Sequence, residues 1–149
     1  MPYVEQSIDI HAPVDAVFGY IADQPDRMAD WWPPIELQER VTPAPTVVGS
    51  VSRYVYNMMG VKIKGEHRIE EMARNQRLLV RTISGIESAF DFSFAPSSVG
   101  TNLTIRVDYT LPGSVLGQLL NRLAIEQKNE RDLQQGLQNL KNILEGARA

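Results

Sequence analysis

The chain contains no cysteine and only two histidines, His11 and His67. The absence of cysteine excludes disulfides, thiolate metal sites and cysteine nucleophiles. Two histidines leave little for a transition-metal site, and no glycine-rich phosphate loop or nucleophile elbow occurs. A formal net charge of -3 without a cluster of lysines and arginines argues against nucleic acid or an anionic membrane as partner. We therefore expect no metal, no cofactor and no nucleic acid.

Targeting and membrane signals are also missing from the pattern. The chain enters a strand pattern at Tyr3, without the charged and apolar regions of a signal peptide. It has no run of about 18 apolar residues, so we expect no transmembrane segment and, by default, a cytoplasmic setting. Its 149 residues fit a single domain, 1–149, without internal repeats or interdomain linkers. The oligomeric state does not follow from the sequence.

Short alternating strands dominate the chain before Pro112. The pattern predicts one strand, a short amphipathic helix opened by Ala12-Pro13, a second helical turn ending at Trp31-Trp32, and six more strands. Short gaps between the last six strands are typical of antiparallel hairpins. The expected strands are Tyr3–His11, Ile35–Val41, Val51–Met58, Val61–Met72, Leu78–Ile83, Ile86–Phe94 and Leu103–Leu111.

Alternation predicts which strand faces are buried. Three strands have a clear inward set: Val61, Ile63, Gly65, His67 and Ile69; Phe90, Phe92 and Phe94; and Leu103, Ile105, Val107, Tyr109 and Leu111. In Ile35–Val41 we expect Glu36, Gln38 and Arg40 on the outer face. In Val51–Met58 neither face is clearly apolar, so either Tyr54 and Tyr56 or Arg53 points inward.

One long helix is predicted at the end of the chain, from Gly113 to about Gly146. It would be roughly 50 Å long at 1.5 Å per residue. A lone helix of this length is not stable in water on propensity alone, so it must lie against the sheet. A curved sheet around one helix commonly leaves a cavity, and we expect the functional site there.

The order of these elements resembles the helix-grip fold of the START/SRPBCC superfamily, which includes the birch-pollen allergen, and most closely its polyketide cyclase/dehydrase-like branch. The residues that carry the resemblance are His11-Ala12-Pro13-Val14-Asp15-Ala16-Val17-Phe18, Trp31-Trp32-Pro33, Val48-Gly49-Ser50, Ile69-Glu70-Glu71-Met72 and Asp108-Tyr109-Thr110-Leu111-Pro112. The resemblance implies an α+β domain whose curved, seven-stranded antiparallel sheet wraps around a long C-terminal helix, with two short helices after the first strand. It also implies a deep hydrophobic cavity. Members bind lipids, sterols, quinones, polyketides or plant hormones, and some are enzymes.

Aromatic and polar residues on the expected inner surfaces are the candidate ligand contacts. His67 is the one histidine on an apolar strand face; it either contacts a ligand or acts as general acid/base, or is simply hydrogen-bonded in the wall. Methionine adapts to irregular ligands, which makes Met59 a candidate lip of the cavity. The remaining strand and loop candidates are Trp31, Trp32, Tyr54, Tyr56, Phe90, Phe92 and Tyr109.

The long helix carries an apolar stripe that changes position along its length. Leu120 and Leu123 belong to the first part, and polar residues, including Gln127 and Glu130, occupy the turn that follows. Two interpretations remain open. This turn looks into the cavity and contacts a ligand head group, or the helix bends and the turn faces solvent with Lys128 or Arg131 paired to the glutamates.

We therefore expect a domain that binds a small hydrophobic molecule, such as a lipid, quinone or polyketide-like aromatic, between the sheet and the C-terminal helix. An alternative is a cyclase/dehydratase-like enzyme with His67 or Glu130 as general acid/base. A third is an interaction module whose concave face is filled by its own side chains.

Overall fold

The computed structural model describes residues 3–110 and 122–146. Elements in the described part follow the predicted order of strand, short helices, six strands and long helix. They are β1 (Tyr3–Ile10), α1 (Val14–Ala22), the 3-10 turn η1 (Pro25–Arg27), α2 (Met28–Trp31), β2 (Ile35–Arg40), β3 (Val51–Met58), β4 (Val61–Ala73), β5 (Arg77–Ser84), β6 (Glu87–Pro96), β7 (Thr101–Thr110) and α4 (Arg122–Gly146).

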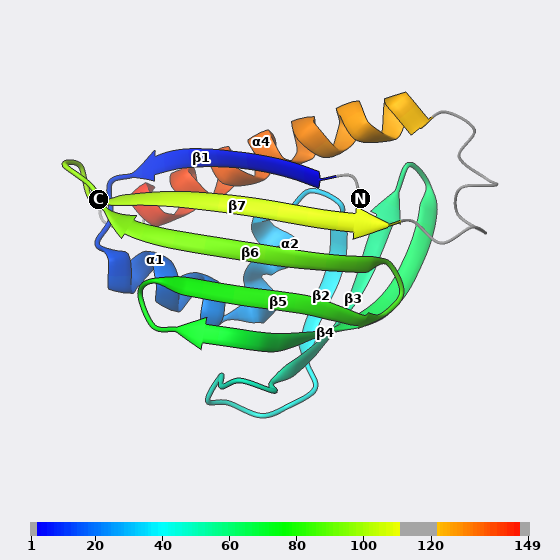
Figure 1. Cartoon of the computed structure of the whole chain (residues 1–149), viewed down its shortest axis with the longest axis horizontal. Helices are drawn as coiled ribbons and strands as arrows, with labels where there is room; N and C mark the ends of the chain where they lie inside the picture. Colours follow the sequence, from blue (N-terminus) through cyan, green and yellow to red (C-terminus); the bar gives the residue numbers. More distant parts are fainter. Residues whose placement is uncertain (1–2, 111–121, 147–149) are drawn as a thin grey trace.

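The seven strands form one antiparallel sheet in the order β1-β7-β6-β5-β4-β3-β2. In Figure 1 the sheet curls so that β2 and β3 turn away from the plane of β5 to β7, while α1, α2 and α4 lie on its concave side. Helix α4 packs along β1 and against α2. The prediction of a curved seven-stranded sheet with one long helix and two short ones is confirmed.

The connection from β1 to β2 brings short helices across the concave face. Pro13 is the N-cap residue of α1, in an extended conformation, as expected for a proline that opens a helix. Val17 and Phe18 on α1 are completely buried. Helix α2 ends at Trp31, just before Pro33-Pro34. Both Trp31 and Trp32 are buried there, on the concave side of the sheet.

A β-bulge in β2 overturns one prediction. Pairing with β3 shifts between Ile35 and Leu37, because Ile35 pairs with Tyr56 and Leu37 already pairs with Val55. One extra residue moves every later side chain of β2 to the opposite face of the sheet. Arg40 is therefore opposite Ser52 on the inner face, and Gln38 is 6% exposed. The expectation that Gln38 and Arg40 lie on the outer face was wrong.

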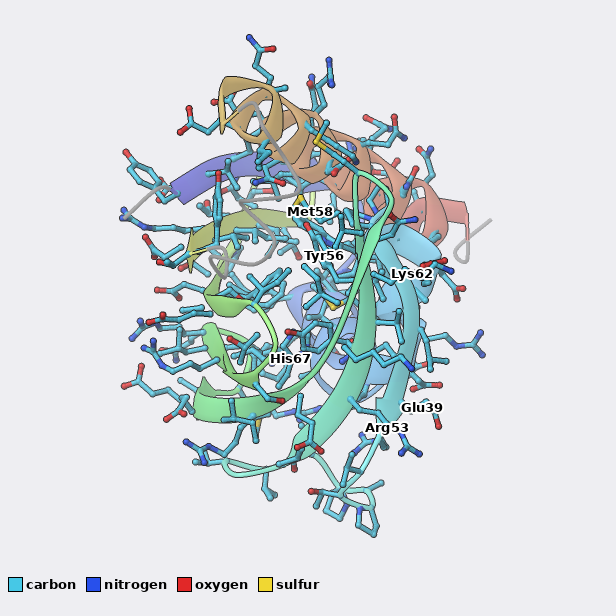
Figure 2. All side chains as sticks on the ribbon, turned by 90° about the vertical axis from the view of Figure 1, so that its right-hand side faces the viewer. Glu39, Arg53, Tyr56, Met58, Lys62 and His67 are labelled. Atoms are coloured by element: carbon cyan, nitrogen blue, oxygen red, sulfur yellow. The ribbon has the colours of Figure 1, made fainter. Side chains whose placement is uncertain are left out.

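The structure also decides the face of β3 that the sequence left open. Tyr54, Tyr56 and Met58 are buried, whereas Arg53 is exposed and pairs with Glu39 at 3.3 Å. Figure 2 shows Arg53 and Glu39 together at the outer surface, apart from Tyr56 and Met58.

Helix α4 is described from Arg122 onward; the expected start at Gly113 and the candidate Leu120 lie outside the described residues. Its buried stripe consists of Ile125, Asn129, Leu133, Leu137, Leu140 and Leu144. Gly136 allows a close approach to α2, because an added Cβ would lie 3.1 Å from the Trp32 ring. The Asn139 amide donates a 3.2 Å hydrogen bond to the Trp31 carbonyl oxygen at the same crossing.

Candidate functional site

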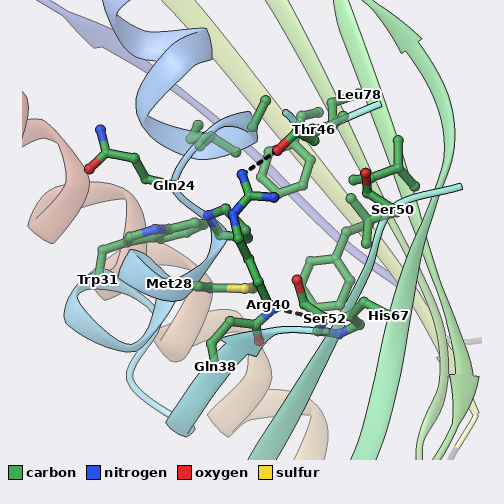
Figure 3. Close-up of a pocket in the computed structure, with 17 residues that line it drawn as sticks. Gln24, Met28, Trp31, Gln38, Arg40, Thr46, Ser50, Ser52, His67 and Leu78 are labelled. Atoms are coloured by element: carbon green, nitrogen blue, oxygen red, sulfur yellow. Dashed lines mark hydrogen bonds between the residues drawn. The ribbon is translucent and has the colours of Figure 1, made fainter. Parts of the chain in front are cut away.

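Two small cavities lie between the sheet and the helices, and His67 and Phe90 line both of them. The larger, which we call the β2 cavity, has a volume of about 50 Å³ and is shown in Figure 3. Its wall consists of Ile21, Ala22, Gln24, Pro25, Met28, Trp31, Gln38, Arg40, Thr46, Ser50, Ser52, His67, Ile69, Leu78, Val80, Phe90 and Phe92. The smaller, the α4 cavity, has a volume of about 30 Å³ and is lined by Val4, Trp32, Tyr54, Tyr56, Met58, His67, Thr82, Ile86, Ser88, Phe90, Val107, Tyr109 and Asn129.

The His67 imidazole belongs to the walls of both cavities. It is 5% exposed, stacks on Tyr54 with 4.4 Å between ring centroids, and meets the Phe90 ring edge-on at 5.7 Å. Its Nδ1 lies 3.3 Å from the Gln38 Nε2. Burial disfavours the charged ring and lowers the pKa of His67 to about 4. At neutral pH the ring is therefore uncharged, with Gln38 as its hydrogen-bond partner among the described side chains.

Tyr54 is held rigidly against His67. Its hydroxyl donates to the Ser84 carbonyl oxygen and accepts from the Ile86 backbone N–H, both at 3.0 Å. Gly65 makes room for the hydroxyl, since an added Cβ there would lie 2.6 Å from it. Because both hydrogen bonds go to backbone groups, the Tyr54 hydroxyl fixes the His67 platform and is not a free handle for a ligand.

The two tryptophans divide between the cavities. Trp31 lines the β2 cavity and Trp32 the α4 cavity. Each is 3% exposed, and their rings meet edge-on at 5.9 Å. Helix α4 covers this segment at Gly136, where an added Cβ would lie 3.1 Å from the Trp32 ring.

The far end of the α4 cavity is polar. Burial raises the pKa of Tyr109, although a hydrogen bond with Asn129 opposes the shift. Burial also raises the pKa of Tyr56, and the nearby Asp132 carboxylate adds to that increase. Both phenols stay neutral across the physiological range and can donate hydrogen bonds.

Side-chain amide oxygens in the two cavities have no hydrogen-bond partner among the described residues. They are Gln38 Oε1 in the β2 cavity and Asn129 Oδ1 in the α4 cavity. The Trp32 indole N–H lies near the Tyr56 hydroxyl without reaching hydrogen-bond geometry. Buried polar atoms in native proteins are nearly always bonded, so these groups mark where a bound molecule or water would find partners.

Of the predicted contacts, most come together and a few do not. Those that line one or both cavities are Trp31, Trp32, Tyr54, Tyr56, His67, Phe90, Phe92 and Tyr109. Met59 is 45% exposed at the β3–β4 turn and lines neither cavity. Leu123 belongs to α4, but its side chain lies outside the described part.

The polar turn of α4 faces solvent at Gln127 and Glu130, which are exposed. The Glu130 backbone carbonyl accepts a 3.2 Å hydrogen bond from Gln6 of β1. This exposure agrees with the interpretation in which the turn faces solvent, except that Lys128 pairs with Asp132 at 2.7 Å and not with a glutamate. The structure thus brings neither Gln127 nor Glu130 to the cavities.

Gln38, Arg40 and Asn129 are among the polar lining residues that the sequence analysis did not predict. Gln38 and Arg40 were hidden by the bulge in β2, which leaves no mark in the hydrophobic pattern. Asn129 could have been found, because it lies four residues from both Ile125 and Leu133 and so continues their stripe.

The described part of the chain lacks two kinds of catalytic grouping. Among its residues, no group of three or more histidine, aspartate or glutamate side chains could hold a metal ion. No carboxylate of the described part lines either cavity, so no acidic partner for His67 is present on those walls. No helix of the described part is long and apolar enough to cross a membrane.

Solved structures share this fold over nearly the whole chain. The protein TTHA0849 from Thermus thermophilus superposes with a TM-score of 0.82 at 22% identity, covering 99% of this chain and 100% of that one. A START superfamily protein from Mycobacterium smegmatis gives 0.72 at 15% identity, with 97% and 98% covered. The major latex-like protein 151 from Panax ginseng gives 0.70 at 14% identity, with 96% and 97% covered. At these identities the likeness concerns the fold alone.

The comparison with curated proteins yields no match. The comparison with protein families yields a match over residues 1–145 to the family described as polyketide cyclase / dehydrase and lipid transport. That match spans nearly all of the chain and agrees with its helix-grip architecture. The chain belongs to the polyketide cyclase/dehydrase and lipid transport family.

Proposed function

We propose that this domain binds a small hydrophobic molecule between the sheet and α4, in the space formed by the β2 and α4 cavities. The observation that carries the proposal is the pair of unpartnered amide oxygens, Gln38 Oε1 and Asn129 Oδ1, one in each otherwise largely apolar cavity of the described part. Apolar walls supply affinity at about 25 cal/mol per Å² removed from water, while a few polar groups fix orientation.

Binding requires the site to widen. Pockets for drug-sized ligands are about 300 Å³ or larger, well above the cavity volumes of about 50 and 30 Å³. The Phe90 ring is the side chain whose movement would widen the site, because it lines both cavities. Its centroid lies 5.7 Å from that of the His67 ring. A shift of the Phe90 ring would join the two cavities beside the imidazole.

Binding is better supported than catalysis. A general base works best with a pKa near the operating pH, and the pKa of His67 is about 4. Glu130, the other candidate acid/base, is exposed. The neutral His67 ring is suited to accept or donate one hydrogen bond to a ligand while its faces pack against aromatic rings.

The test uses N-phenyl-1-naphthylamine, a neutral probe whose fluorescence rises in apolar surroundings. We expect saturable binding by the wild-type protein and tighter binding by Phe90→Leu, because the smaller side chain connects the cavities. The matched control is Phe94→Leu on the same strand face; Phe94 is buried against Phe18 and lines neither cavity. Each variant should lose about 1 kcal/mol of unfolding free energy, so stability alone would not separate them.

Two results would contradict the proposal. If neither the wild-type protein nor Phe90→Leu binds the probe, the concave face is filled and an interaction module is the better description. If Phe94→Leu gains as much affinity as Phe90→Leu, the probe reports loosened packing and not the cavities.

A further inference from the structure

Arg40 is the one charged residue that lines either cavity in the described part of the chain. We propose that its guanidinium binds the carboxylate of an amphipathic ligand whose apolar body lies against Trp31, His67 and Phe90. This inference rests on the proposed function and adds the chemical class of the ligand, a hydrophobic carboxylic acid.

A backbone irregularity turns Arg40 inward. An unbroken β2 would place it on the outer face with Glu36, but the bulge between Ile35 and Leu37 sets it opposite Ser52 on the inner face. Bulges commonly re-aim a side chain next to a functional site. Figure 3 shows Arg40 reaching across the β2 cavity from the strand toward Thr46.

The guanidinium is held in place by neutral groups. Its Nη2 donates to the Thr46 hydroxyl at 2.6 Å and to the Asp23 backbone carbonyl oxygen at 2.8 Å. These bonds fix the plane of the group and occupy one of its nitrogens. Nε and Nη1 have no acceptor among the described residues, and either of them can donate a hydrogen bond to a carboxylate oxygen.

Arg40 is half-buried, and no carboxylate of the described part pairs with it. Arg81 and Arg131 form no ion pair with a described residue either, but both are exposed. Carboxylates pair with these outward-facing arginines: Arg27, Arg53, Arg68, Arg74, Arg77 and Arg106. Asp23 offers Arg40 only its backbone carbonyl, because its carboxylate is bonded to Arg74 at 2.6 Å. A partly buried guanidinium without an anion is costly, and a ligand carboxylate would remove that cost.

The charge count favours a carboxylate over a phosphate. Among the described residues, one cation faces the β2 cavity and none faces the α4 cavity. A carboxylate carries one negative charge at neutral pH, whereas a phosphate monoester carries about 1.5 to 2. The protein as a whole has a formal net charge of -3, so attraction of an anion has to come from this local site.

The test compares 2-naphthoate with 2-naphthamide, which have the same apolar body and differ in the charge of the head group. By isothermal titration calorimetry at pH 7, we expect the wild-type protein to bind naphthoate about 10-fold or more tightly than naphthamide. Arg40→Met should abolish that preference by weakening naphthoate binding, while naphthamide affinity changes little. Arg53→Met is the matched control, because it removes the same charge from the neighbouring strand on the outer face.

The outcomes separate this inference from the function on which it rests. Equal binding of the two naphthalenes by the wild-type protein would overturn the carboxylate site and leave hydrophobic binding intact. An equal loss of preference in Arg53→Met would also overturn it, since the effect would then be long-range charge. If 2-naphthoate, 2-naphthamide and N-phenyl-1-naphthylamine all failed to bind, the proposed hydrophobic binding site itself would be overturned. Naphthamide binding by Arg40→Met shows that this variant is folded, and Arg40→Lys should retain part of the preference.

Discussion

The His67 imidazole lies at the centre of the buried site, and its titration should be visible in the stability of the whole domain. Its pKa falls from 6.5 to about 4 because burial penalises the charged ring. Between these values the unfolded chain binds a proton that the folded protein does not. Stability due to this group is therefore fully present above pH 6.5 and is lost as the pH falls toward 4.

The magnitude follows from linkage. Lowering the pH from 7 to 5 should reduce the unfolding free energy by about 2 kcal/mol through His67 alone. Most aspartates and glutamates titrate below about pH 5, so this interval isolates the histidine. The change is large beside the unfolding free energy of ordinary domains, which is about 5–15 kcal/mol.

Denaturant unfolding at pH 7, 6 and 5, followed by tryptophan fluorescence, measures this dependence, because both tryptophans are buried. His67→Gln keeps a hydrogen-bonding group beside Gln38 and has no proton to gain, so its stability should change little over the interval. His11→Gln removes the exposed histidine and should retain the slope due to His67. The reasoning would be refuted if the unfolding free energy of His67→Gln fell with pH as steeply as that of the wild-type protein. A nuclear magnetic resonance titration of His67 with a midpoint above pH 6 would also refute it.

Two further predictions concern the support of His67 and are read from the same unfolding experiments. Gly65→Ala would place a Cβ 2.6 Å from the Tyr54 hydroxyl and should lower the unfolding free energy by more than about 2 kcal/mol. The control Gly146→Ala has nothing within 4 Å of the added Cβ and should change the unfolding free energy by less than about 0.5 kcal/mol. Similar losses for the two variants would contradict this account. Tyr54→Phe leaves two backbone groups without a partner and should cost about 1–3 kcal/mol, while Tyr3→Phe at a 55% exposed position should be nearly neutral. If the unfolding free energy of Tyr54→Phe equalled that of the wild-type protein, water would have replaced the hydroxyl as partner of the two backbone groups.

The order of elements and most buried strand faces were predictable because the outer sheet face is wet and the inner one apolar. Phe90, Phe92 and Phe94 alternate with polar residues and are all buried as expected. Alternation failed where polar residues point inward. On β3, the inward set of Ser52, Tyr54, Tyr56 and Met58 begins with a serine, so its pattern did not identify the buried face.

Backbone irregularity set the other limit. The bulge in β2 adds one residue without any glycine or proline to mark it, so period-two reasoning gave the wrong face for Gln38 and Arg40. On α4, the leucines on either side of the polar turn predict that the inward stripe passes through Gln127 and Glu130. The actual stripe passes through Asn129.

The residues that local rules misplaced are themselves informative about function. Gln38, Arg40 and Asn129 are polar, and all three line the space between the sheet and the helices. In a core that serves only stability, apolar residues of similar volume at these positions would avoid the cost of burying unpartnered polar groups. Two of the three have amide oxygens without a partner among the described residues, and the third is a cation that no carboxylate of that part pairs with. Sequence patterns are expected to fail most at functional sites, and here the failures converge on the space around His67, which is the strongest reason to look for a ligand there.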